Sequence, residues 1–289
     1  MTHDAPTPEG QLMVVATPIG NLGDLSRRAL ALLESADVVY CEDTRRSRTL
    51  FSAHGIVARQ RLQALHQHNE ASQCDEIVER IRRGAVVVVI SDAGTPGISD
   101  PGTRVVAAVI AAGLRVSTAP GPTALIGALS VSGLPTERFV MEGFLGRKVG
   151  ERALRYESWR REDRTIVFYE SPQRLATTMV ELARHFPERR VAVVRELTKV
   201  HEEVLRGTVA QVSTLIAARE ILGEIVVVLE GAPVAEAVSD ELVVSALREH
   251  LGRGQSLRDA VNEVAEQLGV AHRETYERAL RLRADEGRG

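Results

Sequence analysis

The chain of 289 residues is poor in cysteine, lysine and aromatic residues, and it has no long apolar run. Its two cysteines, Cys41 and Cys74, are too few for a disulfide framework and form no CxxC pair, so we expect reduced thiols in a reducing compartment. The longest clean apolar runs, 85–90 and 105–112, are far shorter than the roughly 20 residues of a membrane-spanning helix, so no membrane span is expected. The N-terminal segment has neither a basic start nor an apolar stretch, which predicts no signal peptide and a cytoplasmic location.

Lysine is almost absent, because 34 of the 36 basic residues are arginine and only Lys148 and Lys199 remain. A nucleotide-composition bias replaces lysine wherever either cation serves, so these two are expected where a compact ammonium is needed instead of a wide guanidinium fork. The net charge of −3 argues against an avid nucleic-acid binder. Two segments are nevertheless basic: 42–61 has five cations and two acids, and 147–164 has seven cations and four acids. Both are candidate phosphate-contacting patches.

Several catalytic and binding motifs are missing. The aromatic fraction of 3% leaves few rings for a base-stacking platform. Neither lysine follows a glycine, which excludes a Walker A loop, and Gly20 and Gly23 give only G-x-x-G instead of the dinucleotide-binding G-x-G-x-x-G. There is no GxSxG or HExxH motif, so a hydrolase is disfavoured. His66 and His68 have no identifiable third ligand, so we expect solvated histidines and no metal site.

Residues 12–119 alternate between apolar β-type runs, glycine-rich turns and helices of period 3.6, which predicts an α/β domain with a mainly parallel sheet. Strands are expected over 12–17, 38–41, 85–91 and 115–119, with a helix over 71–83. Asp24 is expected to N-cap the first helix. Asp100 followed by Pro101 predicts the N-cap and first position of a helix that ends at Gly113.

A second α/β domain with a mixed sheet is expected over 120–231, because the alternation resumes with shorter connections. Its expected strands cover 139–142, 165–169, 191–195, 203–207 and 225–229, and its helices 151–161, 172–185 and 209–218. A linker over 231–240 then leads to a purely helical segment, 240–285. There Ser256 and Asp259 predict a capping box, and a turn at Gly269 separates two helices, 257–268 and 272–282.

Two glycine-rich loops follow buried strands of the first domain, TPIGNLGD over 17–24 and SDAGTPGISDPG over 91–102. Because the carboxyl ends of parallel strands meet at one edge of a sheet, we expect the two loops to lie side by side and to bind a ligand. Polar residues also follow strands of the second domain and are expected to face these loops across a cleft: Glu170, Ser171, Arg195, Glu196, Thr198 and Lys199.

Nine segments occur in an order that closely resembles the ribosomal RNA small-subunit methyltransferase I family, of the tetrapyrrole methylase superfamily. They are VATPIGNLGDLSRRAL, CEDTR, ISDAGTPGISDPG, GPTAL, SGLPTERF, EGFLGRK, FYESP, RELTK and GEIVVVLEG. The resemblance covers about residues 12–282 and implies two α/β domains with S-adenosylmethionine (SAM) bound in the cleft between them, usually in a homodimer. It implies methylation of the ribose 2′-hydroxyl of a decoding-centre cytidine in 16S rRNA, with the small ribosomal subunit as partner.

The resemblance also implies site residues. The cofactor candidates are Pro18, Asp92, Gly94, Thr95, Ile98, Thr123, Ala124, Tyr169 and Glu224. A ribose hydroxyl is a poor nucleophile, so a base near it would help. The candidates for this and other catalytic roles are Glu42, Asp43, Glu170, Glu196, Lys199 and His68, and the sequence does not choose among them. The candidate contacts with RNA phosphates are Arg45, Arg147, Lys148, Arg195 and Lys199.

Two alternatives stay open. A C-methyltransferase acting on a tetrapyrrole precursor would share the fold and the cofactor, although the helical tail and the basic segment 147–164 favour RNA. A non-catalytic nucleic-acid-binding protein could use its terminal helices, but the tail from Arg248 onward has eight cations and eight acids and so lacks the basic footprint of a duplex-DNA reader.

Overall fold

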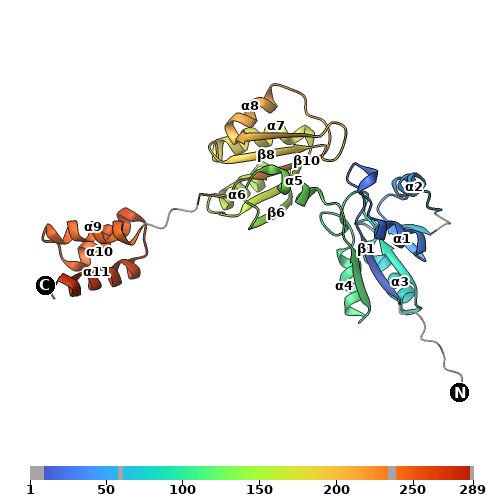
Figure 1. The fold of residues 1–289 in the computed structure, drawn as a ribbon, viewed down its shortest axis with the longest axis horizontal. Helices are drawn as coiled ribbons and strands as arrows, with labels where there is room; N and C mark the ends of the chain where they lie inside the picture. Colours follow the sequence, from blue (N-terminus) through green and yellow to red (C-terminus); the bar gives the residue numbers. More distant parts are fainter. Residues whose placement is uncertain (1–9, 58–60, 234–238, 287–289) are drawn as a thin grey trace, which may run out of the picture. The chain divides into compact units, whose positions relative to one another are not determined.

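The structure is a computed structural model that describes residues 10–57, 61–233 and 239–286. Contacts divide the chain into two compact units, 1–232 and 233–289. The first unit contains two five-stranded sheets (Figure 1). The expected linker over 231–240 falls partly on 234–238, which lie outside the described residues, and the boundaries 12–119, 120–231 and 240–285 remain our proposal. No helix within the described ranges is both long and apolar enough to span a membrane.

The first sheet is entirely parallel, with strand order β3-β2-β4-β1-β5. Its strands are β1 (Gln11–Val15), β2 (Val38–Cys41), β3 (Leu62–Ala64), β4 (Val86–Val89) and β5 (Arg115–Ala119). The helices α1 (Arg27–Ser35) and α2 (Thr44–Ala53) cover one face, and α3 (Glu70–Arg82) and α4 (Thr103–Ala111) cover the other. Because both faces of β4 are covered, Val87 and Val89 pack on one side and Val88 on the other, which explains its unbroken valine run.

Two expected helix caps are wrong. Asp24 ends a short 3₁₀ helix, η1 (Leu22–Asp24), and Ser26 caps α1 by accepting a hydrogen bond from the Ala29 N–H at 3.1 Å. Asp100 does not cap α4 either, because this helix begins at Thr103 with Gly102 as its N-cap residue, at φ +132°.

A side chain from α3 satisfies the start of α4. The buried Glu70 carboxylate accepts hydrogen bonds from the backbone N–H groups of Gly102 (3.0 Å), Arg104 (2.8 Å) and Val105 (3.3 Å). A helix N-terminus needs such acceptors and favours negative charge. This contact between distant parts of the chain leaves the Asp100 side chain free of the capping role.

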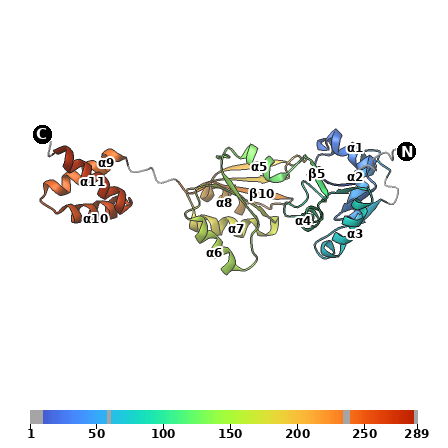
Figure 2. The same ribbon diagram turned by 90° about the horizontal axis from the view of Figure 1, so that it is seen from below.

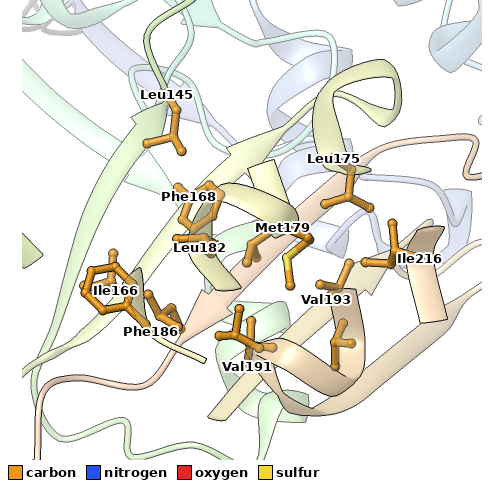
Figure 3. Close-up of a cluster of buried hydrophobic side chains, with 14 of the residues drawn as sticks. Leu145, Ile166, Phe168, Leu175, Met179, Leu182, Phe186, Val191, Val193 and Ile216 are labelled. Carbon is orange, nitrogen blue, oxygen red and sulfur yellow. The ribbon is translucent and has the colours of Figure 1, made fainter. Parts of the chain in front are cut away.

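The second sheet is mixed, as expected, with strand order β6-β7-β10-β8-β9 and only the β6–β7 pair parallel. Its strands are β6 (Phe139–Phe144), β7 (Thr165–Glu170), β8 (Arg190–Arg195), β9 (Glu203–Thr208) and β10 (Ile225–Leu229). Its helices are α5 (Ala124–Ser132), α6 (Val149–Trp159), α7 (Pro172–His185) and α8 (Val209–Ala217). Figure 2 shows α5 on one side of this sheet and α6, α7 and α8 on the other. The larger core includes Phe168, Met179 and Val193 (Figure 3).

The second unit is a small helical bundle. Helices α9 (Asp240–Gly252), α10 (Leu257–Leu268) and α11 (His272–Glu286) bury an apolar core that includes Val243, Leu247 and Val264. Ser256 caps α10, since its hydroxyl oxygen accepts from the Asp259 N–H at 3.2 Å. The other half of the expected capping box is absent, because the Asp259 carboxylate accepts from the Ser256 hydroxyl at 2.5 Å and not from its backbone N–H. Gly269 ends α10 at φ +64°, a conformation that glycine adopts without strain.

Candidate functional site

Two glycine-rich loops meet at the carboxyl edge of the first sheet. Backbone hydrogen bonds run in both directions between Thr17 and Gly94, with N···O distances of 2.9 and 3.1 Å. The Thr17 hydroxyl also donates to the carbonyl oxygen of Ser91 at 3.1 Å. The expectation that loops 17–24 and 91–102 lie side by side is therefore confirmed.

A pocket of about 320 Å³ lies within the first unit and is lined from both sheets. Its walls are the loop after β4, the start of α5 and the strand ends of the second sheet that border them. Seven of the nine expected cofactor residues line it: Gly94, Thr95, Ile98, Thr123, Ala124, Tyr169 and Glu224. Its lining does not include Pro18 or Asp92.

Asp92 instead connects the glycine loop to the start of α2. Its carboxylate accepts a hydrogen bond from the Asp43 N–H at 2.9 Å and forms an ion pair with Arg46 at 3.3 Å. Asp92 therefore fixes the base of the loop whose tip lines the pocket.

The backbone around the pocket is strained at three positions. Ser99, Glu196 and Thr198 are the non-glycine residues with positive φ in the described part of the chain, at 63°, 50° and 68°. Ser99 lines the pocket, and the other two flank its lining residue Leu197. Such conformations cost free energy and persist where the surrounding structure holds them, often at functional sites.

Lys199 joins two carboxylates at the edge of the pocket. Its Nζ lies 2.8 Å from Glu196 Oε1 and 3.1 Å from Glu224 Oε2, and Glu196 Oε1 also accepts from the Glu224 N–H at 2.9 Å. The hydrogen bond from Lys199 lowers the pKa of Glu196. Although burial acts in the opposite direction, the hydrogen bonds to Glu196 and Glu224 raise the pKa of Lys199. Lys199 is therefore a cation at neutral pH.

Two glycines make room for this cluster. A Cβ on Gly20 would lie 2.4 Å from Lys199 Cγ, and a Cβ on Gly223 would lie 2.4 Å from Glu196 Cδ. Gly20 belongs to the loop after β1, so the lysine stem packs against the first sheet's loop while its ammonium group binds carboxylates of the second. A side chain at either glycine would force the cluster to move.

Glu170 is buried, and its carboxylate is fully engaged. It accepts hydrogen bonds from the Ser171 N–H (2.7 Å), the Arg174 guanidinium (3.0 Å) and the Thr178 hydroxyl (2.7 Å). These contacts fasten the first two turns of α7. The geometry therefore favours a positioning role for Glu170 over proton transfer.

Glu42 and Asp43 lie at the end of β2 and outside the lining of the pocket. Asp43 caps α2 and binds the Arg45 guanidinium at 2.8 Å, and the hydrogen bonds from Arg45 lower the pKa of Asp43 to about 2. Asp43 is thus a weak base. Burial, followed by the nearby Asp92 carboxylate, raises the pKa of Glu42.

Asp100 lines the pocket, whereas the Asp-Pro pair in the sequence predicts a helix cap at this position. Burial raises its pKa to about 6, the Glu42 and Asp92 carboxylates act in the same direction, and the Ser91 hydroxyl opposes them. It is therefore a half-buried carboxylate that lines the pocket and titrates near neutral pH. The sequence signal for a functional Asp100 is its place beside Asp92 as the second aspartate of the glycine-rich loop 91–102.

The candidate RNA-contacting residues differ in exposure. Arg147 and Lys148 are exposed just after β6, and Lys148 Nζ lies 3.3 Å from Glu151. Arg45 is exposed beside Asp43. Arg195 is partly buried, donating to Glu203 at 3.3 Å and to the Leu222 carbonyl oxygen at 3.1 Å.

The two histidines do not form part of the pocket lining. The rings of His66 and His68 are edge to face with centroids 5.9 Å apart, and His68 is exposed. Among the described residues, no group of three or more His, Cys, Asp or Glu side chains is arranged to hold a metal ion.

Solved structures with a similar fold include methyltransferases and a synthase. The uroporphyrin-III-C-methyltransferase from Thermus thermophilus has a TM-score of 0.52 at 23% identity, covering 76% of this chain and 94% of that one. Diphthine synthase has a TM-score of 0.57 at 14% identity, covering 76% and 89%. At these identities the likeness is one of fold alone, and it confirms the expected fold class.

Sequence relatives are much closer. A ribosomal RNA small subunit methyltransferase I from Mycobacterium tuberculosis is 44% identical over 281 residues, which cover 96% of this chain and 97% of the relative. A protein of the same name from Xylella fastidiosa is 46% identical, covering 84% of this chain and 90% of the relative. Another from Synechocystis is 39% identical, covering 96% of this chain and 99% of the relative. Residues 11–213 match the family of Tetrapyrrole (Corrin/Porphyrin) Methylases. The chain is therefore a methyltransferase that belongs to the ribosomal RNA small subunit methyltransferase I family, within the tetrapyrrole methylases.

Proposed function

We propose that this chain transfers a methyl group from SAM to the 2′-hydroxyl of a cytidine in the decoding centre of 16S rRNA, acting on the small ribosomal subunit. The observation that carries the proposal is the 44% identity, over nearly the whole chain, to relatives named as methyltransferases of small-subunit ribosomal RNA. The choice of a cytidine ribose hydroxyl rests on the nine motifs shared with that family. C-methylation of a tetrapyrrole is the weaker alternative, because its support is the match to the broad methylase family over residues 11–213 and a likeness in fold at 23% identity or less.

The residues of the pocket fit SAM, a nucleoside with a charged sulfur and an amino-acid tail. A volume of about 320 Å³ suits a small ligand, and Ile98 and Leu197 supply apolar wall. Gly94, at φ +82°, presents backbone to the pocket, and the Thr95 hydroxyl donates to the Pro122 carbonyl oxygen at 3.1 Å, which fixes the tip of the loop. When bound, SAM supplies an electrophilic methyl group on a positively charged sulfur.

We assign the cofactor contacts to the seven pocket-lining candidates and give Asp92 the role of fixing the base of its loop against α2. Pro18 lies outside the pocket lining and stays a candidate from the resemblance. Lys199 keeps Glu224 and Glu196 in place, so it acts as a positioning residue. Because the pocket is lined by both sheets, substrate and cofactor are held in one orientation, and such proximity supplies several kcal/mol of barrier reduction.

Asp100 is our candidate for the proton acceptor. Methyl transfer forms an O–CH₃ bond, breaks the S–CH₃ bond, leaves a neutral thioether and releases the proton of the ribose hydroxyl. A carboxylate with a pKa of about 6 that lines the pocket is ionised at neutral pH and can accept that proton. Among the alternatives, Glu170 and Glu196 have their carboxylates engaged, and Lys199 is protonated.

The test is transfer of labelled methyl from SAM to small ribosomal subunits from a strain that lacks this modification. We expect incorporation into 16S rRNA at a single cytidine ribose, mapped by resistance of the adjacent phosphodiester to alkaline hydrolysis. Running naked rRNA in parallel distinguishes a preformed particle from free RNA as substrate. Incorporation into a tetrapyrrole precursor, with none into RNA, would overturn the proposal.

Three further parts of the proposal have their own measurements. We propose that Arg45, Arg147, Lys148 and Arg195 contact RNA phosphates, which salt dependence of the KM for subunits would report. We propose a homodimer in the cytoplasm, which light scattering and cell fractionation would check. We propose that the reaction needs no metal, so activity should survive a chelator.

A further inference from the structure

Phe144 is the most exposed aromatic side chain in the protein. Six of the ten aromatic residues are buried in the core, whereas Phe144 is 63% exposed and lines the pocket. Its ring packs on that of Tyr169, with centroids 5.3 Å apart and planes inclined by 45°. A large apolar ring left in solvent at the edge of a pocket is available to a ligand.

A backbone irregularity places this ring. Met141 pairs with Val167 and Phe144 pairs with Tyr169, so β6 contains one residue more than β7 over the same stretch. This β-bulge includes Gly143, at φ +67°, and it brings Phe144 opposite Tyr169 instead of Gly143. Bulges at sheet edges commonly redirect a side chain beside an active site, and β6 is an edge strand.

The ring also lies close to the proposed reaction centre. A Cβ on Gly143 would lie 3.9 Å from the Ser99 hydroxyl, so the end of β6 approaches the glycine loop that carries Asp100. Burial, followed by the Asp100 carboxylate, raises the pKa of Tyr169, which places these two groups within electrostatic reach of each other. Phe144, Tyr169 and Asp100 therefore share one wall region of the pocket.

Cations follow the ring along the chain. Arg147 and Lys148 are exposed three and four residues after Phe144. An aromatic ring followed by exposed cations is the combination that binds a single-stranded nucleotide, with the base stacked and the phosphates paired. A tetrapyrrole would also stack, but it carries no regularly spaced phosphates.

We infer that the ring of Phe144 stacks on the nucleobase of the nucleotide that is methylated. The base is then held at the edge of the pocket while its ribose hydroxyl faces Asp100. This inference rests on the proposed function, since it assumes an RNA substrate, and it assigns the stacked base to RNA instead of to the adenine of SAM.

Kinetics of methyl transfer to small subunits test the inference with three variants. Phe144→Leu keeps an apolar side chain and removes the ring, Phe144→Tyr keeps the ring, and Phe139→Leu is the matched control at the other end of β6, outside the pocket lining. We expect Phe144→Leu to raise the KM for subunits about tenfold or more, as loss of one stacked base does, with the KM for SAM unchanged. Phe139→Leu should stay close to the wild type, and Phe144→Tyr, which keeps the ring, should have a KM for subunits well below that of Phe144→Leu.

A binding measurement separates this inference from catalysis. Phe144→Trp adds an exposed indole to a protein whose single tryptophan, Trp159, is buried. Its fluorescence should be quenched by unmethylated small subunits and much less by small subunits reconstituted with 16S rRNA that is abasic at the target nucleotide.

Four results would overturn the inference. For Phe144→Leu these are an unchanged KM for subunits, a rise in the KM for SAM alone, or an oligomeric state that differs from the wild type. For Phe144→Trp the result is equal quenching by intact and abasic subunits. If the wild type methylates no RNA, the proposed function itself fails. An active wild type with an unaffected Phe144→Leu variant removes only the stacking role.

Discussion

Replacing Asp100 with asparagine should separate catalysis from folding. Asparagine has nearly the same shape but cannot accept the proton of a ribose hydroxyl. General base catalysis typically contributes about 10²–10⁴-fold, so we expect kcat to fall at least about 100-fold at pH 8. The KM for SAM should change little, because the amide still lines the pocket.

The pH dependence gives an independent readout. With the pKa of Asp100 at about 6, kcat of the wild type should rise between pH 5 and 7 and then level off, whereas the Asn variant should lack this inflection. The Glu42 carboxylate contributes to the raised pKa of Asp100, so Glu42→Gln should move the inflection to lower pH and preserve the plateau. If Glu42 were the base, its variant would lose the plateau instead.

Stability should change in the opposite direction to activity. Folding raises the pKa of Asp100 from 3.8 to about 6, so the folded state binds this proton more tightly and the free energy of unfolding falls as the pH rises through 6. The full rise corresponds to about 3 kcal/mol, which solvent screening at this half-buried side chain reduces to about 1 kcal/mol. In urea unfolding we therefore expect the Asn variant to be more stable than the wild type at pH 8 and equal to it at pH 4. Full activity of Asp100→Asn, or an inflection near pH 6 in its kcat, would refute the assignment of Asp100 as the proton acceptor.

Two further substitutions test the packing around the pocket. Lys199→Arg puts a wide guanidinium where the stem of Lys199 touches Gly20 and its ammonium group bridges Glu196 and Glu224. We expect kcat/KM to fall about tenfold, which is the scale of one charged hydrogen bond. Unchanged kinetics would show that any cation serves at this position. Glu70→Ala leaves three N–H groups at the start of α4 without their acceptor. It should lower the free energy of unfolding, measured in urea, by about 2 kcal/mol, and Glu70→Gln should lower it less. Equal urea midpoints for Glu70→Ala and the wild type would contradict this role of Glu70.

Elements with strong local signals could be predicted from the sequence almost to the residue. The valine-rich β4 and β10 are covered on both faces, and α7 begins at Pro172 and follows an apolar stripe. Helices α2 and α5 were missed for opposite reasons. The first is rich in arginine and has few apolar residues, and the second is apolar nearly all round and contains Gly127. That glycine is explained by tertiary packing, because a Cβ there would lie 2.6 Å from the Leu197 side chain.

The candidate site was predicted where function depends on loops at strand ends and missed where it depends on distant contacts. The family resemblance implies the seven cofactor candidates that line the pocket. Five of them follow the parallel strands β4 and β5, whereas Tyr169 lies within β7 and Glu224 directly before β10. Asp100 was interpreted as a helix cap because the Asp-Pro pair is a good local signal for one. Only the contact of Glu70 with α4, across more than 30 residues of sequence, shows that this role is already filled. Phe144 depends on a bulge that no pattern of hydrophobicity reveals.

The two lysines occupy different environments, and only Lys199 lies where arginine would not serve. Lys199 is partly buried, its stem lies against Gly20, and its ammonium group bridges two carboxylates, so a compact cation fits where a planar fork does not. Lys148 is 84% exposed and pairs with Glu151 one helical turn away, a setting in which arginine would reach a phosphate equally well. Selection on the pocket explains lysine at position 199. At position 148 the structure provides no reason for it, so the bias alone does not identify that residue as functional.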